Sequence, residues 1–329
     1  MNRLMCLDGL RGIAAMAVVI FHYTYYYNNI YGHDIDVSPL LILARYGVHL
    51  FFMISGFVIF WTISRVNNPL DFIASRFARL YPTFWFAVTV TFLVVCAVSL
   101  PDRVVSFETY LANLTMFHEY ASYGHVDGVY WTLTLELAFY FWILVIYCLR
   151  QLGNIEKILI VWVLVVNALP FIDADLYAGG NWKLNRLLIW DYIEFFAAGI
   201  CFYKYHTRTH TVFTHVLLAM TVLAIWLGRN PVIAVFLWGF YLVFYGAISG
   251  RIAILTSKPL VYLGTISYSL YLIHQNIGYA IIMEFYNRSW SPYVGILVAM
   301  VFSLVAAHCM SKYIERPGAR FIKRKYASW

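Results

Sequence analysis

The sequence predicts an all-α protein: a polytopic membrane helix bundle with about ten transmembrane helices and both termini in the cytoplasm. Three observations lead to this prediction. Of the 329 residues, 62% are hydrophobic and only 12% are charged, and the apolar residues form long runs between short charged loops. A soluble domain carries about a quarter charged residues, so this deficit is too large to reflect an unusually big core.

Ten apolar runs approach the length of a membrane helix, because a bilayer core of about 30 Å requires roughly 20 residues. In chain order they are Gly12–Ile30, Tyr46–Ser64, Leu80–Leu100, Gly128–Leu149, Ile158–Ile172, Leu187–Tyr203, Thr211–Gly228, Pro231–Gly250, Pro259–Met283 and Ser291–Ser311. The fifth and sixth are short, which leaves the count open by one. No internal repeat or soluble segment interrupts the series, so we expect residues 1–329 to form a single integral membrane domain.

Positive charge marks the cytoplasmic side of a membrane protein. With ten spans both termini share one side, which then holds 17 lysines and arginines against 6 on the other. We therefore expect both termini to be cytoplasmic. The first run resembles a secretory signal, but no small-residue cleavage site follows it, so we expect a retained first span.

Charge and cysteine content exclude several classes of partner. The net charge of +7 is spread over short loops, so we expect no nucleic-acid partner. The five cysteines have no metal-ligand spacing, and we interpret them as small buried apolar residues rather than as a metal site or a disulfide framework. The sequence makes no prediction of the oligomeric state.

Ionisable residues inside membrane spans are costly, and each is therefore a candidate functional residue. His22 lies ten residues beyond Gly12, or about 15 Å into the membrane. Glu136 lies eight residues into a span that starts outside, at about 12 Å depth. Asp191 and Glu194 are shallower and three residues apart, which predicts that they share one helical face. Together these residues predict a polar path through the bundle.

Arg11 and His22 are eleven residues apart, or about three helical turns. This spacing predicts that both project from one helix face, with about 16 Å between them along the axis. A guanidinium at the inner membrane edge suits a phosphate group, and a desolvated neutral imidazole can accept a proton from an attacking hydroxyl. A long ligand with phosphates at one end and a reactive group at the other could reach both.

Structural interpretations of the same residues remain open. Arg11 could pair with Asp8, His22 could form an ordinary hydrogen bond between helices, and an arginine pair at 76 and 79 could be loop charges. We expect structural roles for His49, His274 and His308. The tyrosines at 23, 25, 26 and 27 favour an interfacial aromatic belt over a sugar-binding platform.

Six segments, taken together and in order, resemble the acyltransferase family 3 of integral membrane proteins. They are LDGLRGIAAMAVVIFH (7–22), FFMISGFVI (51–59), SRFARLYP (75–82), VYWTLTLELAFY (129–140), LGTISYSLYLIH (263–274) and YIERP (313–317). One departure is Thr132, where the family usually has serine, and the hydroxyl is retained. We expect a member without a fused extracytoplasmic domain.

The resemblance implies a membrane O-acyltransferase of the bacterial inner membrane. Such an enzyme transfers an acyl group, usually acetyl, from a cytoplasmic coenzyme A thioester to a hydroxyl of a cell-surface or exported glycan or its lipid-linked precursor. Acyl-CoA would be a co-substrate, and no permanently bound cofactor is expected. An alternative is a secondary transporter or flippase for a sugar-containing substrate, although no inverted repeat is visible. A third, non-catalytic scaffold would leave the membrane histidine and carboxylate unexplained.

Site roles follow from the same resemblance. His22 and Glu136 are predicted to be catalytic. Acyl-CoA binding is predicted for Arg11, Arg76 and Arg79. Trp131 is predicted to contact the acceptor, and Tyr130 and Ser55 are further candidates for this contact. Candidates for stabilising the developing oxyanion are Tyr130, Thr132 and Ser55. Direct transfer through His22 and a route through an acylated His22 both remain open.

Overall fold

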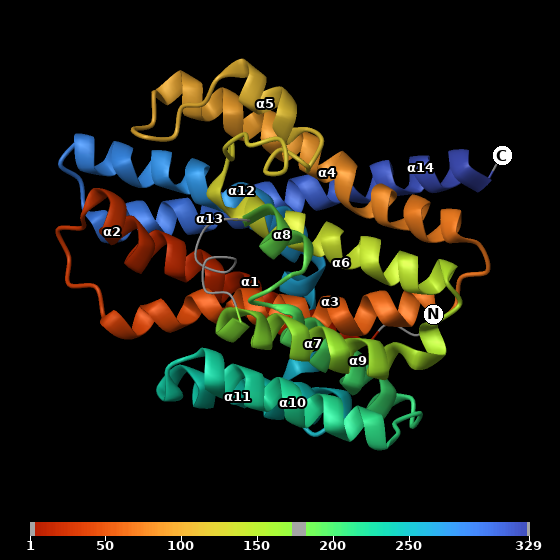
Figure 1. Ribbon diagram of the computed structural model, residues 1–329. Helices are drawn as coiled ribbons and strands as arrows, with labels where there is room; N and C mark the ends of the chain where they lie inside the picture. The colour runs from red at the N-terminus through yellow and green to blue at the C-terminus, as the bar shows by residue number, and fades with distance from the viewer. Residues whose placement is uncertain (1–3, 173–181, 328–329) are drawn as a thin grey trace. The chain divides into compact units, whose positions relative to one another are not determined.

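The computed structural model describes residues 4–172 and 182–327, and these residues form helices and connecting loops without a β-strand (Figure 1). The prediction of an all-α protein is therefore confirmed. The α-helices are α1 (Met5–Phe21), α2 (Tyr27–Tyr31), α3 (Gly47–Ile63), α4 (Pro69–Val98), α5 (Phe107–Asn113), α6 (Trp131–Cys148), α7 (Ile155–Ile172), α8 (Trp182–Leu187), α9 (Ile193–His206), α10 (Val212–Gly228), α11 (Pro231–Ile248), α12 (Lys258–Asn287), α13 (Pro292–Met310) and α14 (Arg316–Ala327).

Seven helical stretches among the described residues are long and apolar enough to cross a membrane. They are Met5–Tyr31, Pro39–Ile63, Pro69–Val98, Gly128–Cys148, Leu152–Leu169, Pro231–Ile248 and Pro292–Tyr326. Three further predicted spans coincide at least in part with α9, α10 and α12, which are shorter or more polar. The helix α12 has 30 residues, but its interior half carries buried serine, histidine, glutamine and asparagine side chains. Seven spans are supported by length and composition, and the count of about ten stays a prediction.

The predicted span Leu187–Tyr203 is not one continuous helix, which corrects one expectation. The helix α8 ends at Leu187, residues 188–192 form turns, and α9 begins at Ile193. Ile189 has a φ of 55°, a left-handed conformation that an α-helix cannot include. Asp191 is exposed in this turn while Glu194 is buried in the first turn of α9, so the two do not share a helical face.

The described residues divide into two compact units, which we describe separately. Unit 1 is drawn from Met1–Leu7, His49–Phe72 and Thr134–Ser257, and unit 2 from Asp8–Val48, Ile73–Leu133 and Lys258–Trp329.

Unit 1 is organised around close contacts of α9. Gly56 on α3 lies against the backbone of Phe196, and Gly199 on α9 lies against the carbonyl of Met53, so that a Cβ atom at either glycine would clash. Small residues of this kind let two helix backbones approach closely where lipid surrounds the bundle. The helix α10 packs against α7, α9 and α11, as Figure 1 shows.

Unit 2 is organised around α12. The helices α12 and α13 lie side by side along most of their length (Figure 1). A Cβ atom at Gly12 of α1 would lie 2.6 Å from the carbonyl oxygen of Leu260, and one at Gly264 would clash with the backbone of Asp8. Further along, Gly278 leaves the space that the ring of Tyr23 occupies. Glycines thus allow the first helix to lie directly on α12, which brings residues near 22 beside residues near 274.

Candidate functional site

His22 lies at a change in helix geometry in unit 2. The α-helical turns of α1 end at Phe21, and residues His22–Tyr26 form a π-helical turn before α2. Such turns are rare and are found frequently at functional sites. The side chain is 9% exposed, and its Nδ1 lies 2.8 Å from the carbonyl oxygen of Val18. The sequence-predicted histidine is therefore buried and held from one side by its own helix.

His274 is the second partner of His22, and no spacing rule connects the two because 252 residues separate them. Nε2 of His274 lies 3.1 Å from Nδ1 of His22. On its other side, Nδ1 of His274 lies 3.1 Å from the carbonyl oxygen of Leu270 and 2.9 Å from that of Tyr271. His274 is fully buried. The structure thus joins a residue expected to be structural to the predicted catalytic histidine.

Tyr23 holds the backbone of α12 at the same level. Its hydroxyl donates to the carbonyl oxygen of His274 at 2.6 Å and also lies 2.7 Å from Oγ of Ser303 on α13. Tyr23 is completely buried. It belongs to the tyrosine cluster interpreted as an interfacial belt, but this member has a specific role in positioning α12.

The segment that precedes α6 holds α12 from a further side. The Asp127 carboxylate accepts from the backbone N–H of Asn276 at 3.1 Å and from that of Val129 at 3.3 Å. The fully buried hydroxyl of Tyr130 donates to the carbonyl oxygen of Leu272 at 3.2 Å. Burial raises the pKa of the Asp127 carboxyl to about 6, although the two backbone donors act to lower it. Sequence reasoning singled out Tyr130 but missed Asp127.

Two further residues of the family-like segment 129–140 have different surroundings. Trp131, the first residue of α6, is partly exposed. Thr132 is buried and its hydroxyl lies 2.9 Å from that of Tyr271, so the threonine supplies the same hydroxyl that a serine would.

Arg103 is a cation of unit 2 that the sequence did not single out. It belongs to the loop between α4 and α5, and its guanidinium lies 6.0 Å from the ring centroid of Tyr279 on α12. Burial acts to lower the pKa of Arg103, but its hydrogen bond with Tyr31 and the neighbouring hydroxyls of Tyr279 and Tyr26 raise it overall. A charged guanidinium therefore lies near the buried Tyr279 and the partly exposed Tyr26 and Tyr31, which follow His274 and His22 in the chain.

The three predicted donor-binding arginines all belong to unit 2. Arg11 pairs with Asp8 at 3.5 Å and adjoins Gly12, which lies on Leu260 of α12. Arg76 and Arg79 are three residues apart on α4 and are partly buried. The adjacent Leu80 accepts a hydrogen bond at its carbonyl from Tyr268 of α12 at 2.9 Å. The arginines thus adjoin helix segments that contact the first half of α12, while His274 lies in the second half.

Glu136 and Ser55, both predicted site residues, meet in unit 1. The Ser55 hydroxyl donates to Oε1 of Glu136 at 2.9 Å, and the Tyr140 hydroxyl donates to the same oxygen at 2.6 Å. Glu136 is only partly buried, and Oε2 has no hydrogen-bond partner among the described residues. By contrast, the buried Glu156 pairs with Lys204 and accepts from Thr214 at 2.9 Å. Glu156 is saturated by partners, whereas Glu136 keeps one oxygen available.

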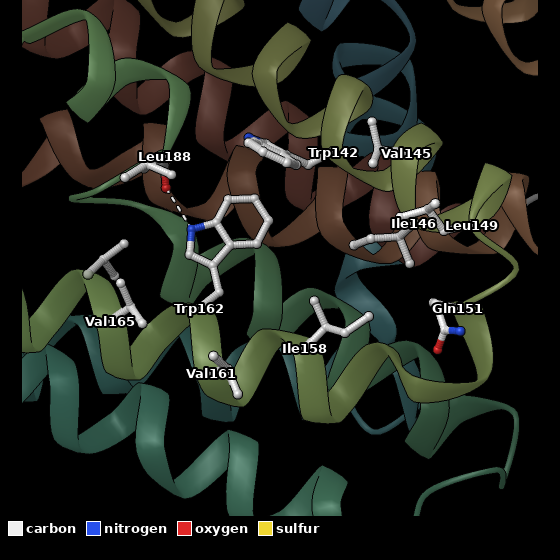
Figure 2. Close-up of a pocket in the computed structure, with 11 residues that line it drawn as sticks. Trp142, Val145, Ile146, Leu149, Gln151, Ile158, Val161, Trp162, Val165 and Leu188 are labelled. Atoms are coloured by element: carbon white, nitrogen blue, oxygen red, sulfur yellow. Dashed lines mark hydrogen bonds between the residues drawn. The ribbon is translucent and has the colours of Figure 1, made fainter.

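Unit 1 also contains two hollows of different character. One, of about 390 Å³, lies between α6 and α7 and is lined by apolar side chains, with Gln151 at one end (Figure 2). The indole N–H groups of Trp142 and Trp162 donate to the carbonyl oxygens of Leu187 and Leu188, so they present no free donor to this groove. The other, of about 520 Å³, is more polar. It is lined by Leu135, Trp182, Asn185, Arg186, Trp190, Asp191 and Tyr192.

A second histidine pair lies in the loop between α5 and α6. Nε2 of His118 lies 2.7 Å from Nδ1 of His125, and Nε2 of His125 lies 3.3 Å from Oε1 of Glu119. His118 and Glu119 are buried, and His125 is partly exposed. Burial, aided by the adjacent His125, lowers the pKa of His118 to about 4. No motif or spacing in the sequence points to this cluster.

The apolar helices are those of a helical membrane protein, and its interior contains the buried ionisable residues His22, His274 and Asp127. The chain belongs to the family described as "Acyltransferase domain", which it matches over residues 5–311. The family predicted from the six sequence segments is therefore confirmed.

Two curated relatives illustrate this similarity. The chain is 38% identical over 100 residues to the exopolysaccharide production protein ExoZ of Rhizobium meliloti (strain 1021), covering 29% of this chain and 31% of that protein. It is 22% identical over 355 aligned positions to the O-acetyltransferase OatA of Staphylococcus aureus (strain NCTC 8325 / PS 47), covering 94% of this chain and 56% of that protein. The chain thus spans about a third to just over half of the length of these relatives. No solved structure matches it.

Proposed function

We propose that the protein is a membrane O-acyltransferase that moves an acyl group, acetyl in the first instance, from acyl-CoA to a glycan hydroxyl. The observation that carries the proposal is the buried His22, whose Nδ1 is held by Val18 and His274 while Nε2 has no hydrogen-bond partner among the described residues. A neutral imidazole with one open nitrogen is suited to general-base catalysis. Membership of the acyltransferase family and the names of the two relatives support the same reaction.

In this proposal the donor enters from the cytoplasm of a bacterial cell and the protein lies in the inner membrane. Ten spans with both termini inside would place Arg11, Arg76 and Arg79 at the cytoplasmic edge. Guanidinium groups suit the phosphates of coenzyme A because they form charge-assisted and bidentate hydrogen bonds. The pantetheine arm would then extend along unit 2 until the thioester reaches His22.

The acceptor is a hydroxyl of a cell-surface or exported glycan, or of its lipid-linked precursor. His22 removes the hydroxyl proton as the oxygen attacks the thioester carbonyl, a C–O bond forms, and the C–S bond breaks. The proton then passes to the departing thiolate, which leaves as coenzyme A. In the alternative route His22 is itself acylated before the acceptor attacks, which predicts ping-pong kinetics.

We propose that Glu136 takes part in catalysis through Oε2, because Ser55 and Tyr140 already donate hydrogen bonds to its other carboxylate oxygen. Trp131 is the proposed aromatic contact for the acceptor, because its ring is partly exposed. Tyr130 is fully buried and its hydroxyl is bonded to Leu272, so we propose that it supports α12 rather than the acceptor.

The experiment compares surface glycans from cells with and without the gene by mass spectrometry. The proposal predicts an ester-linked acyl group that disappears with the gene and returns with the wild-type protein but not with His22→Ala. Identical glycans in all strains would contradict it. Proton-driven uptake of a sugar into proteoliposomes, without acyl transfer, would instead establish the transporter alternative.

A further inference from the structure

The proton positions on the two buried histidines follow from their partners. Nδ1 of His274 faces two backbone carbonyl oxygens, of Leu270 and Tyr271, and a carbonyl oxygen only accepts hydrogen bonds. Nδ1 of His274 must therefore carry a proton. In the neutral ring Nε2 of His274 is then an unprotonated acceptor.

The same reasoning applies to His22. Its Nδ1 faces the carbonyl oxygen of Val18 at 2.8 Å and the unprotonated Nε2 of His274 at 3.1 Å. Both partners are acceptors, so Nδ1 of His22 carries the proton. The reverse arrangement would set lone pairs against three carbonyl oxygens, those of Val18, Leu270 and Tyr271. In a neutral ring Nε2 of His22 is left with its lone pair.

We infer that His274 is a positioning residue that accepts the Nδ1 proton of His22 and so presents Nε2 of His22 as the base of the proposed acyl transfer. The kinetic part of this inference rests on the proposed function. The proton positions follow from the hydrogen-bond partners alone. During transfer the proton of the glycan hydroxyl moves to Nε2 of His22, and the Nδ1 proton of His22 stays between His22 and His274.

Proton transfer strengthens the contact between the two histidines. Once Nε2 of His22 has taken the proton, the ring is a cation and its Nδ1–H···Nε2 bond to His274 is charge-assisted. Such bonds are roughly twice as strong as neutral ones, so His274 stabilises the transition state more than the resting state. Loss of His274 should consequently lower kcat and leave the KM for the donor nearly unchanged.

The surrounding structure fixes His274 in place for this role. Its backbone carbonyl accepts from Tyr23, the residue that follows His22, and the backbone N–H of Asn276 two residues later donates to Asp127. Gly278 makes room for the Tyr23 ring one helical turn further along α12. The two histidines are therefore connected both through their rings and through Tyr23.

Two variants of His274 distinguish positioning from packing. The side-chain oxygen of glutamine reaches about as far as Nε2 of histidine, whereas asparagine reaches only as far as Nδ1. We expect His274→Asn to lower kcat by about 10- to 100-fold, and His274→Gln to recover a large part of this loss because it again offers an acceptor to Nδ1 of His22. His308→Gln is the control, since His308 is exposed and its hydrogen bond in the described structure is with Tyr262.

The decisive experiment is nitrogen NMR of protein labelled with ¹⁵N-histidine, with His22 and His274 assigned through variants. We expect protonated Nδ1 and unprotonated Nε2 in both rings, and a coupling across the hydrogen bond that His274→Asn removes and His308→Gln retains. Protonation of His22 at Nε2, or a kcat of His274→Asn equal to wild type, would overturn the inference. Kinetics use radiolabelled acetyl-CoA and glycan from cells that lack the gene. If the proton positions are as expected but the wild type transfers no acyl group, the proposed function fails and the assignment of protons stands.

Discussion

Unit 2 contains two hydrogen-bonded histidine pairs that differ in what lies at their ends. The pair His22–His274 ends on backbone carbonyls of α1 and α12, whereas the pair His118–His125 ends on the carboxylate of Glu119. A backbone carbonyl oxygen only accepts hydrogen bonds, so these partners fix one direction of proton donation in the first pair while both rings are neutral.

The loop pair has the opposite character. Nε2 of His125 faces Glu119, so its Nδ1 accepts from Nε2–H of His118, while Nδ1 of His118 is buried without a partner among the described residues. The direction of this hydrogen-bonded series depends on the carboxylate of Glu119 and on His125, which is partly exposed. A histidine pair is therefore suited to catalysis when fixed groups hold it, and suited to responding to pH when titratable groups do.

The largest expected effect separates the two pairs by activity. His22→Ala should reduce turnover by about 10²- to 10⁴-fold, because general-base catalysis contributes that much. His125→Ala should leave turnover within about threefold, since general-base catalysis by His22 does not pass through the loop. Acyl transfer to glycan from cells lacking the gene measures both, with circular dichroism as the folding control. Equal losses of turnover in His22→Ala and His125→Ala would contradict the assignment of different roles to the two histidine pairs.

A second prediction concerns the cationic end of the same unit. Arg79→Ala should raise the KM for acetyl-CoA by about 10-fold or more, because a charge-assisted bond to phosphate is worth roughly 1.5–3 kcal/mol. The kcat should change less than it does in His22→Ala. A matched control is Arg320→Ala on α14, which removes an exposed charge predicted to be cytoplasmic. Unchanged donor affinity in Arg79→Ala would count against phosphate binding there.

A third prediction tests what anchors the interior pair. Asp127→Ala leaves the buried N–H of Asn276 without its carboxylate, which should cost about 1–3 kcal/mol of stability. The pair His22–His274 should then be less well ordered, so turnover should fall together with the thermal midpoint in detergent. Asp127→Asn keeps one acceptor oxygen, so its turnover and thermal midpoint should lie between those of the wild type and Asp127→Ala. A thermal midpoint of Asp127→Ala equal to wild type would show that the carboxylate does not hold α12.

The smallest effect is the pH response of the loop pair. Burial and His125 lower the pKa of His118 from its usual 6.5 to about 4, so the folded loop favours the neutral ring. This contribution to loop stability is complete above pH 6.5 and is lost as the pH falls toward 4, by roughly 1 kcal/mol after solvent screening. His118→Gln should remove the response. Hydrogen exchange of residues 114–127, compared between wild type and variant at each pH, measures it, and identical pH dependence in both would exclude His118.

The sequence predicted what depends on local pattern. Apolar run lengths indicated most of the helices, and Arg11 and His22 do lie in one helical stretch, Met5–Tyr31. That the two share one helix face stays a prediction, and their spacing did not predict the π-helical turn that begins at His22. The break at residues 188–192 was missed because an apolar run does not report a left-handed residue such as Ile189.

Contacts between distant segments lay beyond such patterns. His274 meets His22 because Gly264 and Gly278 let α1 lie on α12, and no spacing in the chain encodes that approach. Asp127 was missed because its partners are backbone N–H groups, which leave no side-chain pattern in the sequence. Ser55 and Glu136 were each singled out, but their hydrogen bond required the fold of unit 1.

The most direct test of the account is acyl transfer by the purified protein in nanodiscs, given radiolabelled acetyl-CoA and glycan from cells that lack the gene. We expect glycan-dependent release of coenzyme A together with label in the glycan, and loss of both in folded His22→Ala. Full turnover by His22→Ala would contradict the role of His22, and an absence of label in the glycan with every acyl-CoA donor would contradict the proposed reaction itself.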